Sequence, residues 1–276
     1  MRSIVLTALL LVVLVACRKG NDNDNDNHTS APSYDSTHSP FMQRTIVQLD
    51  TYHKDSACIQ VPEHYYSGFD TEKYPLVIFF NGRYEGSDYG NLRAMLKWGV
   101  PKFMADSIRF TFNLAGTNQQ MIMLCPQSSN GYPSQYDIGK TIDYMLAKYR
   151  VDPSRIYLTG LSSGAAAVFS YLTYSMANAS RIAAAVPMSS LELETEKIAN
   201  MKFIADAHTP VKIFCGRLDD GYFKNKSYAD EINKYSPGLA VFTSYGGRHG
   251  SWNERYDPSH AFYDPNMYEW MLQYHR

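Results

Sequence analysis

Several features that point to particular protein classes are scarce in this chain of 276 residues. Charged residues make up only 19% of it, and 26 lysines and arginines face 27 aspartates and glutamates, so no basic surplus is available to attract a nucleic acid. The four cysteines include no Cys-x-x-Cys pair, and no histidine-rich cluster accompanies them. We therefore expect no nucleic-acid partner, no metal and no essential disulfide, although one pair among Cys58, Cys125 and Cys215 could form in an oxidising compartment.

A hydrophobic run long enough to cross a bilayer comfortably is missing at the N-terminus. Residues 4–16 are apolar except for Thr7 and follow Arg2, a pattern typical of a signal peptide. The run ends in Leu-Val-Ala-Cys at residues 14–17, which resembles the lipobox of bacterial lipoproteins. That resemblance implies that Cys17 is lipidated and anchors the protein to a membrane; a simple secretory signal is the alternative.

The segment after Cys17 has too few apolar residues to fold. Residues 20–27 read Gly-Asn-Asp-Asn-Asp-Asn-Asp-Asn, and Ser, Thr, Pro and His follow up to residue 40. This composition predicts a flexible tether, and it lacks the glycine and terminal glutamate of an EF-hand loop. The expected organisation is a signal peptide over 1–17, a tether over 18–42 and one folded domain over 43–276. We expect this domain to be secreted across the inner membrane and held at the cell envelope, on the outer membrane or the cell surface.

From residue 45 onward, apolar runs alternate with helical patterns. Repeated strand–helix–strand units predict an α/β fold with a doubly wound, mostly parallel sheet, which binds ligands at the carboxyl ends of its strands. Two short antiparallel strands are expected first, at 45–50 and 57–62. The later strands are expected at 76–80, 121–125, 155–159, 182–187, 211–216 and 240–245. Helices are expected at 91–104, 137–149, 165–176, 224–235 and 267–275.

The clearest chemical signal is the sequence Gly-Leu-Ser-Ser-Gly at residues 160–164. It follows a predicted buried strand and precedes a helix of small residues, which is the setting of a nucleophile elbow. In such a turn the serine has a strained backbone, and Gly160 and Gly164 avoid clashes. The helix start also presents N–H groups to a developing anion. The motif predicts Ser162 as a nucleophile; a structural glycine turn is the alternative.

A nucleophilic serine needs a base, and the base needs an acid to orient it. The loop after the predicted strand 211–216 contains Asp219 and Asp220, and the loop after strand 240–245 contains His249. Of the eight histidines, His249 is the one that follows a strand downstream of an acid, the order expected in this fold class. Both aspartates fit the acid position. Asp220 could instead cap the turn or helix that follows it.

Acyl transfer also needs two N–H donors for the oxyanion. The N–H of Ser163, directly after the nucleophile, is expected to be one of them. The other is expected from the loop after strand 76–80, at Arg83 or Tyr84, where Gly82 allows an unusual backbone geometry. An ordinary strand-to-helix turn is the alternative reading of this loop.

Together these residues resemble the esterase branch of the α/β-hydrolases, which contains feruloyl and acetyl-xylan esterases, polyhydroxybutyrate-depolymerase-like enzymes and carboxylesterase/phospholipase-like proteins. The resemblance covers residues 74–274 and is most specific at 151–162, Val-Asp-Pro-Ser-Arg-Ile-Tyr-Leu-Thr-Gly-Leu-Ser. It implies the α/β-hydrolase fold with Ser162 as nucleophile and His249 as base. It also selects Asp219 as the acid, because the family's acid stands three residues after the glycine that ends the strand.

The resemblance departs from the family pattern in the oxyanion loop, where Asn81-Gly82 replaces the usual His-Gly and Arg83-Tyr84 replace small residues. Even so, it implies hydrolysis of carboxylic esters through an acyl-enzyme, without a cofactor. The substrate would be a small molecule or a polysaccharide carrying acyl or feruloyl esters. Two alternatives stay open: a serine peptidase on the same fold, and a non-catalytic ligand-binding lipoprotein derived from an esterase.

Overall fold

The computed structural model describes residues 42–49, 54–67, 71–83, 91–128, 132–191 and 193–276. The chain divides into two units, 1–31 and 32–276, and the described residues all belong to the second. The predicted signal peptide with Cys17, the predicted tether up to residue 41, and Tyr84 lie outside the described residues. Within the described ranges, no helix is both long and apolar enough to span a membrane.

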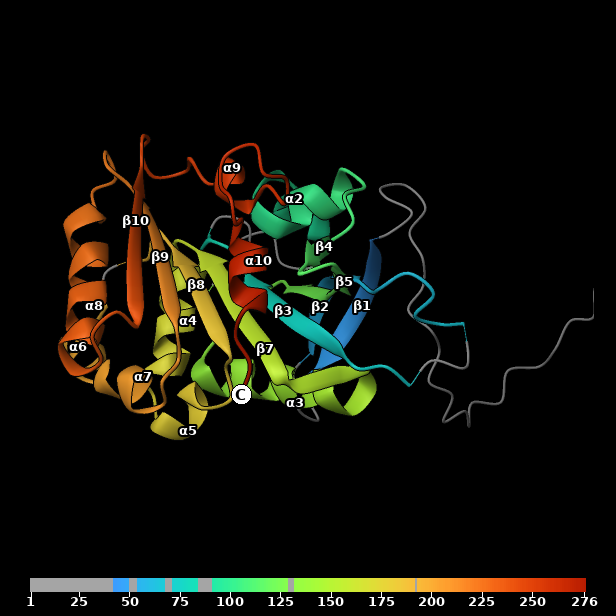
Figure 1. The fold of residues 1–276 in the computed structure, drawn as a ribbon, viewed down its shortest axis with the longest axis horizontal. Coiled ribbons are helices and arrows are strands. Elements are labelled where there is room, and N and C mark those ends of the chain that lie inside the picture. Colours follow the sequence, from blue (N-terminus) through green and yellow to red (C-terminus); the bar gives the residue numbers. More distant parts are fainter. Residues whose placement is uncertain (1–41, 50–53, 68–70, 84–90, 129–131, 192) are drawn as a thin grey trace, which may run out of the picture. The chain divides into compact units, whose positions relative to one another are not determined.

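The centre of the second unit is an eight-stranded sheet (Figure 1). From β6 to β10 all neighbouring strands are parallel, whereas β2 is antiparallel to both β1 and β6. The predicted mostly parallel sheet with two short antiparallel N-terminal strands is therefore confirmed. In spatial order the strands are β1 (Gln43–Gln48), β2 (Lys54–Gln60), β6 (Ile122–Pro126), β3 (Tyr74–Phe80), β7 (Val151–Leu161), β8 (Ala184–Met188), β9 (Val211–Gly216) and β10 (Ala240–Tyr245).

Helices cover both faces of this sheet. Along β3, Leu76, Ile78 and Phe80 pack into one apolar cluster, while Val77 and Phe79 pack into a second one on the opposite face. Every residue of β3 is buried, which explains why the sequence of this strand is a continuous apolar run. On the first face lie α3 (Gln135–Lys148), α4 (Ser163–Leu172), α7 (Lys202–Asp206) and α8 (Tyr222–Tyr235). On the second lie η1 (Leu92–Lys97), α2 (Gly99–Ala105), α9 (Asn253–Tyr256) and α10 (Met267–Leu272).

The structure differs from the expected elements at a few places. The predicted helix at 91–104 divides into η1 and α2, because Gly99 has a φ of +63°. The predicted strand at 155–159 is longer, because β7 begins at Val151 and its pairing with β3 shifts register near its start. The Asp152 carboxylate accepts the N–H of Ser154 there at 2.9 Å. The sequence also gave no signal for two short helices and a small hairpin, because these segments are short and partly exposed. They are α5 (Met176–Ala179), α6 (Thr195–Ala199), β4 (Thr111–Leu114) and β5 (Thr117–Gln120).

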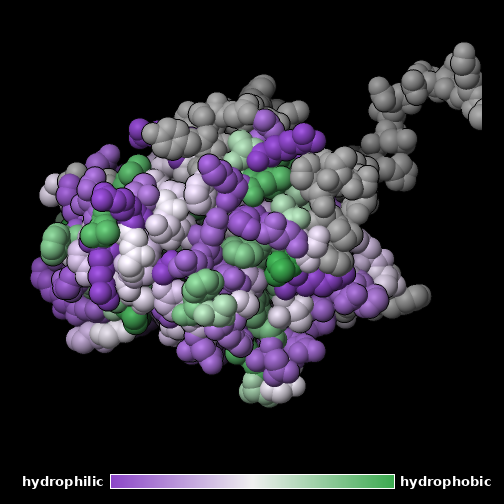
Figure 2. Space-filling view, turned by 90° about the horizontal axis from the view of Figure 1, so that it is seen from above, coloured by the Kyte–Doolittle hydropathy of each residue, from purple (hydrophilic) through white to green (hydrophobic). Residues whose placement is uncertain are grey.

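Strands β3 and β6–β10 end at one edge of the sheet, the upper edge in Figure 1, because they are parallel. Figure 2 looks onto this edge from above. Hydrophilic residues predominate on the described part of this face, and hydrophobic residues appear as small separate areas. Ligand sites in doubly wound sheets lie at this edge, and Ser162, Asp219 and His249 follow the strands that end there.

Candidate active site

The turn between β7 and α4 has the geometry of a nucleophile elbow. Ser162 adopts φ 56° and ψ −117°, a conformation that residues with a Cβ rarely adopt. A Cβ on Gly160 would lie 2.7 Å from the carbonyl carbon of Gly164, and one on Gly164 would lie 2.6 Å from the carbonyl oxygen of Asn81. No side chain fits at either glycine, so the tight turn follows from the sequence at 160–164.

Ser162, His249 and Asp219 form a continuous line of hydrogen bonds. The Oγ of Ser162 lies 3.0 Å from Nε2 of His249, and Nδ1 of His249 lies 2.8 Å from Oδ2 of Asp219. The Asp219 side chain is 5% exposed and that of His249 is 42% exposed. Asp220 is exposed, so the structure places Asp219, and not its neighbour, against the imidazole.

Close packing of two loops makes this contact between acid and base. The N–H of Arg217 donates to the carbonyl of Tyr245 at 2.8 Å, and the N–H of Leu218 donates to the carbonyl of Gly247 at 3.0 Å. A Cβ on Gly216 would collide with the peptide of Gly247. The loops after β9 and β10 therefore approach more closely than larger residues would permit, which brings the two side chains within hydrogen-bonding distance.

The environment of Asp219 keeps its carboxyl group ionised. Burial by itself would raise the pKa of Asp219, but hydrogen bonds from His249 and from the N–H of Gly221, at 2.9 Å, outweigh it and lower that pKa. A buried, ionised carboxylate can hold the imidazole in one orientation and stabilise it when it is protonated.

Besides the bond to Asp219, aromatic packing supports the His249 ring. The Trp252 ring meets the His249 ring edge-on, with centroids 5.1 Å apart, and meets the Trp98 ring in the same way at 5.7 Å. The side chain of Asn253 accepts the N–H of Gly99 at 3.0 Å. These contacts fasten the His249 loop to the junction of η1 and α2. The sequence did not predict this contact, because no spacing along the chain relates Trp98 to Trp252.

The predicted oxyanion donors lie on two segments that touch. Ser163 is the first residue of α4, and the loop after β3 packs directly against the elbow at Gly164. Nδ2 of Asn81 donates to the carbonyl of Gly82 at 2.7 Å. Because the C=O and N–H of a trans peptide point in opposite directions, this bond turns the N–H of Arg83 away from Asn81. Arg83 is exposed, Tyr84 lies outside the described residues, and which of them donates stays a prediction.

Unsatisfied polar atoms gather around this site. Among the described residues, five buried side-chain nitrogen or oxygen atoms have no hydrogen-bond partner, and three of them belong to Asn81, Ser163 and Trp252. Such atoms are rare in folded proteins and tend to mark functional sites.

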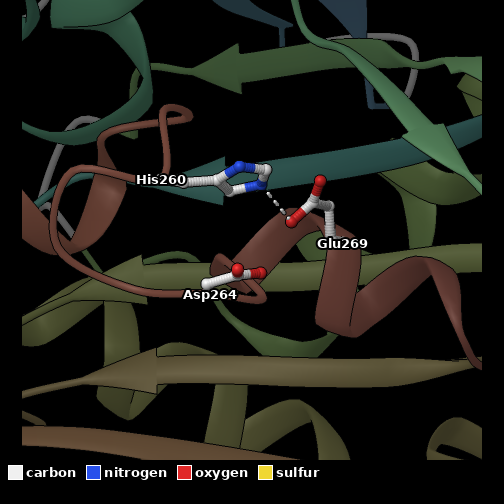
Figure 3. Close-up of side chains that lie close together, drawn as sticks. All are labelled: His260, Asp264 and Glu269. Atoms are coloured by element: carbon white, nitrogen blue, oxygen red, sulfur yellow. Dashed lines mark hydrogen bonds and ion pairs between the residues drawn. The ribbon is translucent and has the colours of Figure 1, made fainter.

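Side chains of metal-ligand type come together in one other place among the described residues. Ligand atoms of His260, Asp264 and Glu269 lie within 4.8 Å of one another (Figure 3). Nε2 of His260 is 2.7 Å from Oε2 of Glu269, which also accepts the N–H of Asn266 at 3.2 Å in the capping box of α10. These bonds give Glu269 a structural role at the start of α10.

The described cysteines are unpaired and buried. Cys58 and Cys125 are register partners on β2 and β6, and burial raises the pKa of both thiols. Burial likewise raises the pKa of Cys215 to about 12. Thiols with a raised pKa stay protonated, so none of the three is activated as a nucleophile.

Known structures share this arrangement of strands and helices. A fungal esterase from Rhizomucor miehei is 12% identical, with a TM-score of 0.56 over 86% of this chain and 84% of its own. The feruloyl esterase module from Clostridium thermocellum, in complex with sinapinate, is 14% identical, with a TM-score of 0.53 over 79% of this chain and 87% of its own. The chain has the α/β-hydrolase fold.

Another structural neighbour is dipeptidyl peptidase 4 of Porphyromonas gingivalis. It is 12% identical, with a TM-score of 0.54, and the match covers 86% of this chain but 36% of the peptidase. No protein-family model and no curated protein matches the sequence. At such identities the likeness establishes the fold and does not establish the chemistry.

Proposed function

We propose that this α/β-hydrolase is a serine hydrolase that cleaves carboxylic esters through an acyl-enzyme intermediate. The observation that carries the proposal is the line of hydrogen bonds from Ser162 through His249 to Asp219, built on an elbow in which Ser162 has a φ of 56°. A nucleophile, a base and an orienting acid are in contact there, and the base is accessible to substrate and water.

In the first half of the reaction, Ser162 Oγ attacks the ester carbonyl carbon while His249 Nε2 takes the hydroxyl proton. The carbonyl electron pair moves onto oxygen, where the N–H of Ser163 and an N–H of the loop after β3 stabilise the oxyanion. Collapse of the tetrahedral intermediate breaks the bond to the leaving oxygen. His249 returns the proton to that oxygen, the alcohol departs, and the acyl group remains on Ser162.

In the second half, water replaces the alcohol. His249 removes a proton from water as its oxygen attacks the acyl carbon, the same donors stabilise the second oxyanion, and Ser162 leaves with the proton from His249. Asp219 keeps the imidazole oriented and stabilises its charged form in both halves. Each step uses side chains and peptide groups of this chain.

We further propose acyl or feruloyl esters of carbohydrates as the substrate class. The described face around the carboxyl edge is mainly hydrophilic (Figure 2), which suits a hydrated substrate better than a lipid. One neighbour of the same fold is a feruloyl esterase module and another is an esterase, which supports ester over amide cleavage. The dipeptidyl peptidase neighbour keeps amide hydrolysis as the alternative.

The test is labelling with a fluorescent fluorophosphonate. The wild-type protein and the Ser227→Ala variant, which changes an exposed serine on α8, should be labelled, and Ser162→Ala should not. A panel of acetyl, feruloyl and longer-chain esters, with peptide amides alongside, then defines the substrate. A folded wild-type protein that neither takes the label nor cleaves a member of the panel would contradict the proposal and favour a ligand-binding protein.

A further inference from the structure

Strand β8 and the residues after it lie between the nucleophile and the acid of the proposed triad. Ser162 follows β7 and Asp219 follows β9, and β8 is the strand between those two. The segment from the end of β8 bonds to both backbone groups of the nucleophile. The N–H of Ser162 donates to the carbonyl of Met188 at 3.0 Å, and its carbonyl accepts the N–H of Leu191 at 3.4 Å. The segment 188–191 is therefore fastened to the nucleophile through the backbone.

A buried side chain of α8 bonds to this segment. Asn225 is 0% exposed; its Oδ1 accepts the N–H of Ser190 at 2.9 Å, and its Nδ2 donates to the carbonyl of Ser190 at 2.9 Å. Nδ2 also donates to the carbonyl of Gly221 at 3.0 Å. The partners fix the orientation of the amide, because an N–H can bond only to its oxygen and two carbonyls can bond only to its nitrogen. All the donors of this side chain are therefore used on backbone groups.

Gly221 connects Asn225 to the acid. The N–H of Gly221 donates to Oδ1 of Asp219 at 2.9 Å, and its carbonyl also accepts the backbone N–H of Asn225 at 2.9 Å. A Cβ on Gly221 would lie 3.2 Å from Nδ2 of Asn225 and 3.3 Å from Oδ1 of Asp219, and it would be 3.4 Å from the carbonyl oxygen of Ser190. Glycine rotates more freely than other residues, so a fixed carbonyl helps to keep its N–H directed at the carboxylate.

We propose that Asn225 is a positioning residue that sets the place of the acid relative to the nucleophile. This inference rests on the proposed function. On one side Asn225 holds Gly221, whose N–H bonds to Asp219. On the other side it holds the segment 188–191, which bonds to Ser162. Acid and nucleophile are thus connected through a buried amide as well as through the imidazole. Since displacements of about 1 Å can slow a reaction strongly, this connection keeps the triad in its working geometry.

A second asparagine of α8 provides a matched control. Asn233 accepts the N–H of Ala240 at 2.9 Å and donates to the carbonyl of Ala240 at 2.8 Å, so it too bonds to both backbone groups of one residue. Ala240 begins β10, at the end of the strand opposite to the carboxyl edge. Asn233 is half-buried. The two asparagines make the same kind of contact from the same helix, and they differ in their distance from the triad.

The experiment compares Asn225→Ala with Asn233→Ala on an ester that the wild type cleaves. Both variants should melt at a lower temperature than the wild type, because each loses a pair of hydrogen bonds. At a temperature at which all three proteins are folded, Asn225→Ala should lower kcat about tenfold and leave KM within about twofold. The effect falls on kcat because the acid stabilises an imidazolium that forms only during the reaction. Asn233→Ala should leave both constants within about twofold.

Gly221→Ala tests the same connection with the Asn225 amide in place. Gly221 has a φ of −83°, which alanine also adopts, so the effect of the methyl group comes from its close contacts. It should push Asn225 and Asp219 away by a few tenths of an ångström and lower kcat by less than Asn225→Ala does. If Asn225→Ala does not fold, this variant decides. Wild-type kcat in folded Asn225→Ala would overturn the inference, as would equal losses in Asn225→Ala and Asn233→Ala, or wild-type kcat in Gly221→Ala where Asn225→Ala does not fold.

A measurement without substrate distinguishes this inference from the proposed function. The NMR signal of Nδ1 of His249, recorded in protein labelled at histidine, reports the 2.8 Å bond to Asp219. In Asn225→Ala this signal should move toward that of an imidazole without the bond, and in Asn233→Ala it should stay in place. If the wild type cleaves no ester, the proposed function fails while this comparison still tests how Asp219 is held. Identical signals in the wild type and Asn225→Ala would overturn the inference whether or not the protein is an esterase.

Discussion

Two neighbouring aspartates after β9 have the same chemistry and very different surroundings. Asp219 is buried against His249, whereas Asp220 is exposed. The sequence leaves both open, and the contact between Gly216 and Gly247 decides between them, because it sets which residue of the loop reaches the imidazole. Spacing carried over from the resembled family selects the same residue, but the physical reason is visible only in the packed loops.

This difference gives a matched pair of variants. Asp219→Asn should lower kcat by about three to four orders of magnitude, because the amide cannot hold the imidazole in the required tautomer or stabilise its charge. Asp220→Asn, one residue away, should leave kcat within about twofold. Steady-state kinetics on one ester substrate measures both, and comparable losses in the two variants would contradict the assignment of Asp219.

At the level of elements, the elbow and helix α3 each contain a glycine, Gly164 and Gly139, and the space around these two glycines differs. A Cβ on Gly164 would collide with backbone atoms of the β3 loop, whereas a Cβ on Gly139 would lie 3.8 Å from its nearest neighbour, the Tyr171 ring. Gly164→Ala should therefore lower the free energy of unfolding by roughly 3 kcal/mol or more. Gly139→Ala should raise it by roughly 0.5–1 kcal/mol, because alanine loses less backbone entropy in a helix. Denaturant titrations of both variants test the pair, and equal effects would show that the elbow tolerates a side chain.

The start of α10 should make stability depend on pH. The hydrogen bond and charge of Glu269 raise the pKa of His260 above its ordinary value (Figure 3). A group with a raised pKa in the folded state stabilises the fold below its unfolded pKa, about 6.5, and that contribution is lost as pH rises through the folded value. His260→Gln should therefore melt at a lower temperature than the wild type near pH 6, and the difference should shrink at alkaline pH. His275→Gln, at an exposed histidine, is the control; a difference that grows with pH would have the wrong sign.

At the scale of the whole molecule, the sequence was informative wherever the signal is local or ordered along the chain. Buried runs such as residues 76–80 predicted the parallel strands. The order of serine, acid and histidine along the chain predicted that Ser162 and His249 would meet, with Asp219 or Asp220 as the acid. The contact between Gly216 and Gly247 could not be predicted in this way, because the two glycines are brought together only by the pairing of β9 with β10. Contacts of this kind depend on sheet order, which no spacing along the chain encodes.

The anchoring of the molecule remains a prediction from the sequence, since Cys17 lies outside the described residues. We propose that Cys17 carries a lipid and holds the folded domain at the cell envelope. In a bacterial host, the wild type should incorporate labelled palmitate and sediment with membranes, and Cys17→Ala should do neither. Unlabelled wild type released in soluble form would favour a simple secretory signal.

The position of the three site residues in the sheet bears on how the protein loses activity. Ser162 follows β7 in the middle of the sheet, whereas His249 follows β10, which is an edge strand among the described residues and pairs there with β9. Edge strands fray at lower free energy than central ones, so local opening of β10 removes the imidazole while the core is intact. In urea, ester hydrolysis should therefore disappear at a lower concentration than the far-ultraviolet circular dichroism of the fold, and amide hydrogens of β10 should exchange before those of β7. Coincident loss of both signals would mean that β10 opens only with the whole domain.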